Sequence, residues 1–586
     1  MTWLARTPVS LLLCLLFAGL CAWCDGATDG ELHDIPASCT NILVGKDASA
    51  DGRAMISYSC DGAPYGRVQV VHGQTYPTGS TVVIYENPPY GAYDEYFALM
   101  RDLGAVGTIP QVERTFQYID LIGWYGAHWG GMNEAGVTIF ETTIGGRPEL
   151  VNPQGIFGIG AQISPESSLL VLALQRASTA RAAIEIMGEL AELYGYHQPR
   201  FHGEHLSITD GEEIWIMEIF GPGPDWSPGS QQPGAVWCAK RLPDDHVGVS
   251  ANCSRIGAID FDDSENVMCS LNAVSLAVEM GWWDPSGNRE FLWYEAYALS
   301  DFEYCSLREW RVLDVLAPSR GLDADDGRYP LSARPDHEVT LEDLMQLHRD
   351  FYAGTPYDAG RTVAEDLTSD QAALIYPYRR YSWIHDPVQD VLGVDPQRTI
   401  AVWSAFSCIA EVTPDPNPGP GRNHPHPLTG CLWYGQGPAA TTCYLPIYSG
   451  VTDVPAAWSQ TDPTQIDWES AHWAFSLVHE LARHGGWQDS LSAVESVRRP
   501  AEESLREIQD EVRRHVQDAL LQHGIEAAQS LLTGWTSAWM TEIVETYWQL
   551  VDYLLFTHYF PGSYRDPLQL PRIALPDLDS LPAFSP

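Results

Sequence analysis

The strongest structural signal is the stretch Cys39-Thr-Asn-Ile-Leu-Val-Gly-Lys-Asp-Ala-Ser-Ala-Asp-Gly52-Arg-Ala-Met-Ile-Ser-Tyr-Ser-Cys-Asp61. It begins with a run of β-forming residues, passes through a segment rich in aspartate and glycine, and continues into a second β-forming run. Runs bounded by such turn residues are typical of two strands joined as a hairpin. The sequence therefore predicts a strand, a turn and a strand that begin at a cysteine and end at an acid.

The residues before Cys39 have the pattern of a removable leader. Residues 1–24 contain Arg6, an apolar stretch over residues 9–22 and a plausible cleavage site, which together indicate a signal peptide. Residues 25–38 are acidic and hold few large apolar side chains, as a propeptide or spacer would. The alternative is that they are the disordered N-terminus of a secreted protein, in which case Cys39 is an ordinary core cysteine.

Cleavage before Cys39 would place a thiol and a free α-amine on one residue. An N-terminal amine has a reference pKa of about 7.7 to 8.0, so it can accept the thiol proton through one water molecule. This arrangement is the design of an N-terminal-nucleophile hydrolase. The leader and the hairpin together therefore predict that Cys39 is a nucleophile.

Composition limits the partners of the chain. A net charge of −44 over 586 residues and a pI near 4.5 exclude nucleic acid and anionic membranes as partners, because both would be repelled. No later apolar run is long enough to span a bilayer, so we expect a soluble mature protein, secreted or periplasmic. Export permits disulfides, but the sequence leaves their pairing and the oligomeric state open.

Short strands are predicted through the first half of the chain and helices at its end. Helices are predicted over residues 179–194 and 340–352, where apolar residues recur with helical spacing, and residues 413–426 are predicted to form a loop. We expect a catalytic domain over residues 39–470 and a helical extension over residues 471–586 packed on it. The strands are predicted at residues 68–71, 81–85, 136–141, 206–209 and 214–219, and an apolar stripe for packing at Leu505, Ile508, Val512 and Val516.

Several stretches resemble the cysteine N-terminal-nucleophile dipeptidase family, the dipeptidase A-like peptidases. The resemblance covers roughly residues 39–564, and it implies a four-layer αββα sandwich shared with penicillin V acylase and bile-salt hydrolase, within the α+β class. It also implies amide cleavage through an acyl-enzyme, small peptide substrates, and no cofactor or metal. The similar stretches are Cys39-Thr-Asn-Ile-Leu-Val-Gly-Lys46, Gly130-Gly-Met-Asn-Glu-Ala-Gly-Val137, Glu141-Thr-Thr, Glu213-Ile-Trp-Ile-Met-Glu218, Ala251-Asn-Cys-Ser-Arg-Ile256 and Gly450-Val-Thr-Asp.

The same resemblance assigns roles to three residues. Cys39 matches the nucleophile, and its freed amine would be the general base. Asp61, which a returning hairpin would bring back to the first strand, matches the acid that orients this amine. Asn252 matches the oxyanion-hole asparagine, whose amide N–H can contribute about 2.7 to 4 kcal/mol to transition-state stabilisation. Without the resemblance, Asp61 would be a turn residue and Asn252 a helix cap or a buried loop residue.

An arginine and one departure from the family pattern complete the predicted site. Arg308 is the best match to the arginine that supports the nucleophile, Arg311 competes for this role, and either could instead pair with one of the many acids. Many relatives carry an arginine three residues before the Asp61 position, where this chain has Tyr58. The resemblance also leaves Glu141 or Thr143 to complete the pocket, although each could be an ordinary strand-end residue.

Other catalytic motifs fit less well. His479 and His484 resemble a zincin pair, but a spacing of five residues, about 500° of helix rotation, puts them on different faces, so we expect a helix end there. The histidine pairs at residues 202 and 205 and at 424 and 426 lack a third ligand at a recognisable spacing. The acidic segment at residues 323–327 lacks the spacing of an EF-hand and is predicted to be a solvated turn.

The expected function is that of a secreted dipeptidase, matured by cleavage between Ser38 and Cys39. The first alternative keeps the fold and the nucleophile but hydrolyses N-acyl amides, as penicillin V acylases and bile-salt hydrolases do. The second is a secreted relative that has lost activity and acts as a binding protein.

Overall fold

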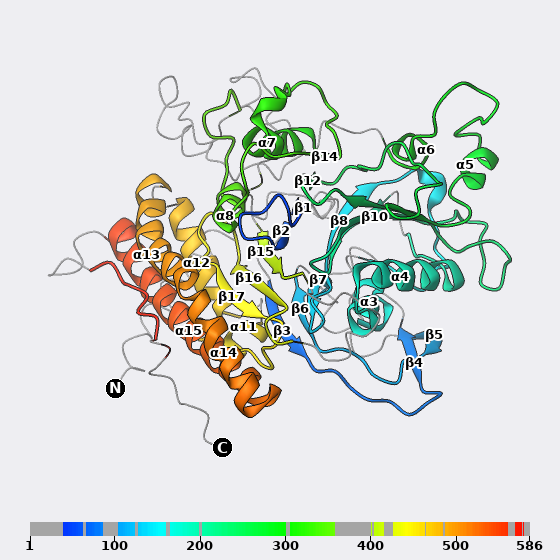
Figure 1. Cartoon of the computed structure of the whole chain (residues 1–586). Coiled ribbons are helices and arrows are strands. Elements are labelled where there is room, and N and C mark those ends of the chain that lie inside the picture. The colour runs from blue at the N-terminus through cyan, green and yellow to red at the C-terminus, as the bar shows by residue number, and fades with distance from the viewer. Residues whose placement is uncertain are drawn as a thin grey trace.

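The computed structural model describes residues 39–61, 66–85, 104–123, 127–159, 165–198, 202–299, 305–357, 400, 404–414, 426–462, 465–484, 487–560, 569–576 and 578. The expected signal peptide and propeptide lie outside these residues, as does most of the loop expected at residues 413–426. The described elements form two large antiparallel sheets with helices on both sides (Figure 1).

The first sheet contains the hairpin predicted from the sequence. Cys39–Val44 (β1) pairs with Ala54–Asp61 (β2), and every residue of both strands is buried. Both faces of the sheet are covered at these strands, so the polar residues of β2, Ser57, Ser59 and Asp61, are buried as well. The sheet order is β14-β12-β1-β2-β15-β16-β17, with β14 at Ser332–Ala333, β12 at Val247–Ser250, β15 at Ser404–Val412, β16 at Gly430–Gln436 and β17 at Leu445–Tyr448.

The second sheet supplies the facing layer. Its order is β13-β11-β10-β9-β8-β7-β6-β3, and a separate small sheet pairs Thr81–Tyr85 (β4) with Ala105–Pro110 (β5). The strands expected near residues 68–71, 136–141, 206–209 and 214–219 are confirmed as members of this sheet. The bounds are Arg67–Val71 (β3), Tyr118–Ile122 (β6), His128–Asn133 (β7), Thr138–Gly145 (β8), His202–Thr209 (β9), Ile214–Phe220 (β10), Val236–Leu242 (β11) and Val267–Cys269 (β13).

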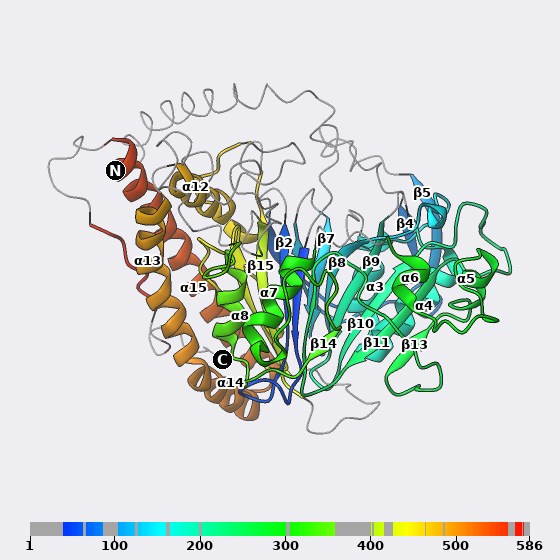
Figure 2. The ribbon, with the colours of Figure 1, turned by 90° about the horizontal axis from the view of Figure 1, so that it is seen from above.

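Helices cover the outer faces of both sheets, so the molecule has four layers. Leu169–Arg176 (α3) and Ala180–Tyr194 (α4) pack on the second sheet, whose other face meets β1 and β2. Viewed from above, the order is C-terminal helices, first sheet, second sheet, then α3 and α4 (Figure 2). The predicted αββα sandwich with a helical C-terminal part is therefore confirmed. The remaining helices are Ser275–Glu279 (α5), Trp293–Tyr297 (α6), Ser306–Leu316 (α7), Leu341–His348 (α8), Ala456–Ser459 (α11), Ala471–His484 (α12), Trp487–Glu507 (α13), Gln509–His523 (α14) and Ile525–Leu554 (α15).

Two helices begin at capping residues that the sequence contains. The side chain of Thr179 accepts a hydrogen bond from the third helical residue of α4, and Thr340 forms a capping box with Asp343 at the start of α8. The prediction that the second helix extends to residue 352 is wrong, because α8 ends at His348. Tyr352 has a φ of +61°, in the left-handed region that a helix cannot accommodate.

The C-terminal helices are joined to the segments around the first sheet by buried polar contacts as well as by the predicted apolar stripe. Arg349, after α8, donates to Glu502 of α13 over 2.5 Å, and the hydroxyl of Tyr547 donates to the carbonyl of Thr441 over 2.7 Å. Leu505 belongs to the same buried core as the strands. None of the described helices, α15 included, has both the length and the apolarity to cross a membrane.

Candidate active site

Cys39 lies at the start of a central strand, between β12 and β2. It is fully buried and stands opposite Cys60, so Asp61 is the next residue along the neighbouring strand. The pairing of β1 with β12 begins only at Asn41, which faces Ser250. The main-chain nitrogen of Cys39 therefore lies outside the hydrogen-bond ladder between β1 and β12 and needs a different partner.

That partner is the side chain of Asn252. The Cys39 nitrogen donates to Asn252 Oδ1 over 3.0 Å, and the guanidinium of Arg308 donates twice to the same oxygen, at 3.2 Å each. Because all three groups are donors, only the oxygen of the amide can face them. The amide nitrogen of Asn252 points the other way and donates to the carbonyl of Thr143 over 2.8 Å.

Arg308 holds the main chain on both sides of this contact. Its side chain is fully buried, and it donates to the carbonyl of Cys39 and the hydroxyl of Thr40 at 2.9 Å each and to the carbonyl of Ala251 at 2.8 Å. A planar guanidinium can serve this many acceptors at fixed angles, which an ammonium cannot. Arg311, the competing choice, lies elsewhere and forms a bidentate pair with Asp350.

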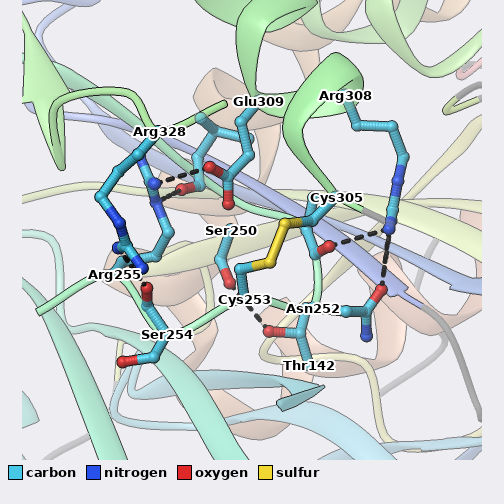
Figure 3. The surroundings of a disulfide bond; sticks show 12 residues. Thr142, Ser250, Asn252, Cys253, Ser254, Arg255, Cys305, Arg308, Glu309 and Arg328 are labelled. Carbon is cyan, nitrogen blue, oxygen red and sulfur yellow. Dashed lines mark hydrogen bonds and ion pairs between the residues drawn. A yellow bond between two sulfur atoms is a disulfide. The ribbon is translucent and has the colours of Figure 1, made fainter. Parts of the chain in front are cut away.

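A disulfide joins the two segments that carry Asn252 and Arg308. Cys253 and Cys305 are bonded, with their Cα atoms 6.1 Å apart, and Cys305 is the residue before α7 (Figure 3). On the other side of the disulfide, Arg255 pairs with Glu309 over 2.6 Å, both side chains being buried. The turn at Asn252 is thus tied to α7 by a covalent bond as well as by an ion pair.

The thiol faces a different set of groups. Cys39 Sγ lies 3.2 Å from the hydroxyl of Tyr58 and 3.3 Å from Glu141 Oε1, and the Tyr58 hydroxyl donates to the same carboxylate oxygen over 2.7 Å. Both side chains are fully buried. The tyrosine that the sequence marks as a departure from the family pattern therefore contacts the nucleophile directly.

The electrostatic surroundings keep the thiol protonated. Burial raises the pKa of the Cys39 thiol well above its usual range, the hydrogen bond with Cys60 adds to this, and the negative charges of Glu141 and Asp61 raise it further. A thiolate does not form spontaneously in such a place. Attack on a carbonyl would need a base that removes the proton during the reaction.

The structure thus brings Cys39, Asp61, Asn252 and Arg308 together. Sequence reasoning missed Glu204, which neighbours Glu141, and it treated Tyr58 only as a departure from a pattern. A charged residue inside an otherwise buried strand such as β9 is a signal that could have marked Glu204.

The alternative metal motifs do not form sites among the described residues. His202 and His205 are three apart in β9 and so project to opposite faces, and His205 lies near Glu218 instead. His479 contacts Thr441, and α12 ends at His484 as expected. The described residues contain a possible three-ligand cluster at Cys253, Cys305 and Glu309, but the first two are bonded to each other. His424 lies outside the described residues.

Comparisons with known proteins place the chain in a family. The family described as Peptidase family C69 matches residues 38–499. Dipeptidase A of Lactobacillus helveticus is 25% identical over 454 residues, covering 76% of this chain and 81% of the relative. A dipeptidase of Bifidobacterium longum is 26% identical over 496 residues, covering 78% and 79%. A solved penicillin V acylase from Agrobacterium tumefaciens aligns with 12% identity and a TM-score of 0.26, over 70% of this chain and 86% of that one. The chain belongs to peptidase family C69 and is a cysteine-type peptidase.

Proposed function

We propose that this protein is a dipeptidase that matures by cleavage between Ser38 and Cys39 and works through a Cys39 acyl-enzyme. The observation that carries the proposal is the contact between the Cys39 nitrogen and Asn252 Oδ1. In the uncut chain this nitrogen is an amide, which donates but cannot act as a base. After cleavage the same atom would be an amine, already held at the nucleophile by an acceptor that keeps its lone pair free for a proton.

The reaction then follows from the groups around Cys39. The amine takes the thiol proton, directly or through one water, as the sulfur attacks the scissile carbonyl. It returns a proton to the departing amino group as the tetrahedral intermediate collapses to a thioester. Water activated by the same amine hydrolyses the thioester. The Cys39 thiol regains its proton and the amine regains its free lone pair.

Arg308 and Asn252 act in this proposal by positioning. Arg308 fixes the Cys39 carbonyl and the Asn252 oxygen at once, which sets the direction of the amine relative to the thiol. The oxyanion-hole role expected for Asn252 stays a prediction, because its amide nitrogen is engaged by Thr143. Asp61, buried beside Cys60, is proposed to bias the amine toward its protonated form once it has accepted the proton.

The substrate class and the location are part of the proposal. The relatives are named dipeptidases, and they match this chain over about four fifths of their own length. The Cys253–Cys305 disulfide suits an oxidising compartment, which favours a secreted or periplasmic protein.

The test combines a processed protein with a substrate panel. Purified exported protein should hydrolyse unmodified dipeptides, and Cys39→Ala should lose this activity while keeping the wild-type melting temperature. Cys431→Ala, which changes another buried cysteine on β16, is the matched control and should remain active. Hydrolysis that survives Cys39→Ala would overturn the proposal, as would turnover of N-acyl amides in preference to dipeptides.

A further inference from the structure

Two buried carboxyl groups lie beside the nucleophile and are not needed for the steps above. Glu141 of β8 is fully buried and Glu204 of the adjacent β9 is 6% exposed. Glu204 pairs with Thr143 in the ladder between β8 and β9, and Thr143 is two residues after Glu141 on β8. One oxygen of Glu141 accepts from Tyr58 and contacts the thiol, and one oxygen of Glu204 lies 3.5 Å from the Thr143 hydroxyl.

The second oxygen of each group has no donor outside the pair. Oε2 of Glu141 and Oε2 of Glu204 are buried, and apart from the hydrogen bond between the two carboxyls themselves, no residue that the structure describes donates an N–H or O–H to either. Neither carboxyl forms an ion pair with an arginine or lysine in the described part of the chain. Leaving a buried carboxylate oxygen without a donor is costly, so this arrangement points to a cationic or donor group that arrives from outside.

The raised pKa values of Glu141 and Glu204 suit a ligand that carries one positive charge. Burial raises the pKa of both carboxyls, and the charge of Glu141 together with a hydrogen bond between the two raises that of Glu204 well above its usual range. When two carboxyls in contact share one proton, the pair carries one net negative charge. One ammonium group would neutralise it.

Substrate geometry allows an ammonium to reach this place. In a peptide with a free amino terminus, the α-nitrogen is two bonds from the first carbonyl carbon, about 2.5 Å away. A reacting thiol stands about 3 to 3.5 Å from that carbon, so the ammonium of a bound dipeptide lies within about 6 Å of the sulfur. Glu141 Oε1 is 3.3 Å from the same sulfur, within reach of this ammonium.

We propose that Glu141, held by Tyr58 and backed by Glu204, binds the α-ammonium of the first substrate residue and restricts this peptidase to substrates with a free amino terminus. The inference rests on the proposed function, because it takes Cys39 as the nucleophile. Acylation of the amino group removes the positive charge and leaves the carboxylate buried and unpaired. An N-acetyl dipeptide should therefore be rejected although its scissile bond is unchanged.

The experiment compares an alanyl dipeptide with its N-acetyl form on the processed protein. Wild type should prefer the free dipeptide by at least about a hundredfold in kcat/KM. Glu141→Gln keeps the shape but removes the charge, so the preference should fall about tenfold or more, mainly through a higher KM for the free dipeptide. Glu411→Gln, another buried glutamate at the far end of β15, is the matched control and should leave the preference unchanged.

Two readouts separate failure of this inference from failure of the proposed function. Alkylation of Cys39 by iodoacetamide and the melting temperature report whether Glu141→Gln still has a reactive thiol and a folded chain. If Cys39 is essential for dipeptide hydrolysis but wild type cleaves both substrates equally, the proposed ammonium site is wrong, while the assignment of Cys39 as the nucleophile is retained. An unchanged preference in a folded, alkylatable Glu141→Gln variant would also overturn it.

Discussion

The two sides of Cys39 differ in charge and in how they are built. On the main-chain side, Asn252 accepts a hydrogen bond from the nitrogen of Cys39 and Arg308 donates one to its carbonyl, and a disulfide holds the two segments together. On the thiol side, Glu141 and Tyr58 form an anionic surface, and the second oxygen of Glu141 has no donor in the described residues other than the Glu204 carboxyl. We infer that the first side positions the catalytic group and the second selects the substrate.

Among the variants that test this comparison, Arg308→Lys should have the largest effect on activity. Lysine keeps the positive charge but cannot reach the carbonyl of Cys39, the hydroxyl of Thr40 and Asn252 together. Misplacing the nucleophile should lower kcat about a hundredfold with KM little changed, measured by steady-state kinetics. Arg311→Lys, one turn further along α7, is the control; equal losses in both variants would mean that Arg308 acts only through helix stability.

Tyr58→Phe tests the other side and should have a smaller effect. It removes a hydrogen bond to a buried carboxylate, which is worth about 1.5 to 3 kcal/mol, and leaves the ring stacked on Phe140. We expect kcat/KM for dipeptides to fall about tenfold, mainly through KM. A loss confined to kcat would instead assign Tyr58 to the chemical step.

Breaking the disulfide should affect stability more than catalysis. The Cys253→Ala/Cys305→Ala double variant opens a loop closed over a separation of 52 residues, which should cost roughly 4 kcal/mol of unfolding free energy in denaturant titrations. We expect only a few-fold loss of kcat, because Arg255 still pairs with Glu309. Cys269→Ala, at a half-buried free cysteine, is the control. Unchanged stability of the double variant would contradict the claim that the disulfide holds the turn at Asn252 to α7.

The smallest effect is a pH-dependent change in melting temperature for Glu204→Gln. The folded-state pKa of Glu204 is raised well above 4.5, so the folded state keeps a proton that the unfolded chain loses as pH rises. Wild type should therefore lose stability relative to the variant as pH increases from about 4.5 toward neutrality. The variant's advantage should be absent at pH 4 and grow above it; Glu526→Gln, an exposed change at the start of α15, should show no such trend.

Local patterns in the sequence predicted the parts of the site that depend on local structure. The hairpin from Cys39 to Asp61 follows from strand and turn signals, the helix after Thr179 follows from the helical spacing of its apolar residues, and both are confirmed. Which arginine contacts Cys39 depends on which face of α7 meets β12. Only the structure shows that Arg308 does so and that Arg311 pairs with Asp350 instead. The Cys253–Cys305 pairing and the approach of Glu204 to Glu141 depend on segments brought together by the fold, so no spacing in the sequence could reveal them.

The central claim is that the Cys39 nitrogen becomes a free amine, and N-terminal sequencing of the purified, exported protein tests it most directly. The account predicts a chain that begins Cys-Thr-Asn-Ile, with dipeptidase activity that rises as this form accumulates. A fully active protein that retains residues before Cys39 would contradict it, because the nitrogen bound to Asn252 would then be an amide that cannot accept a proton.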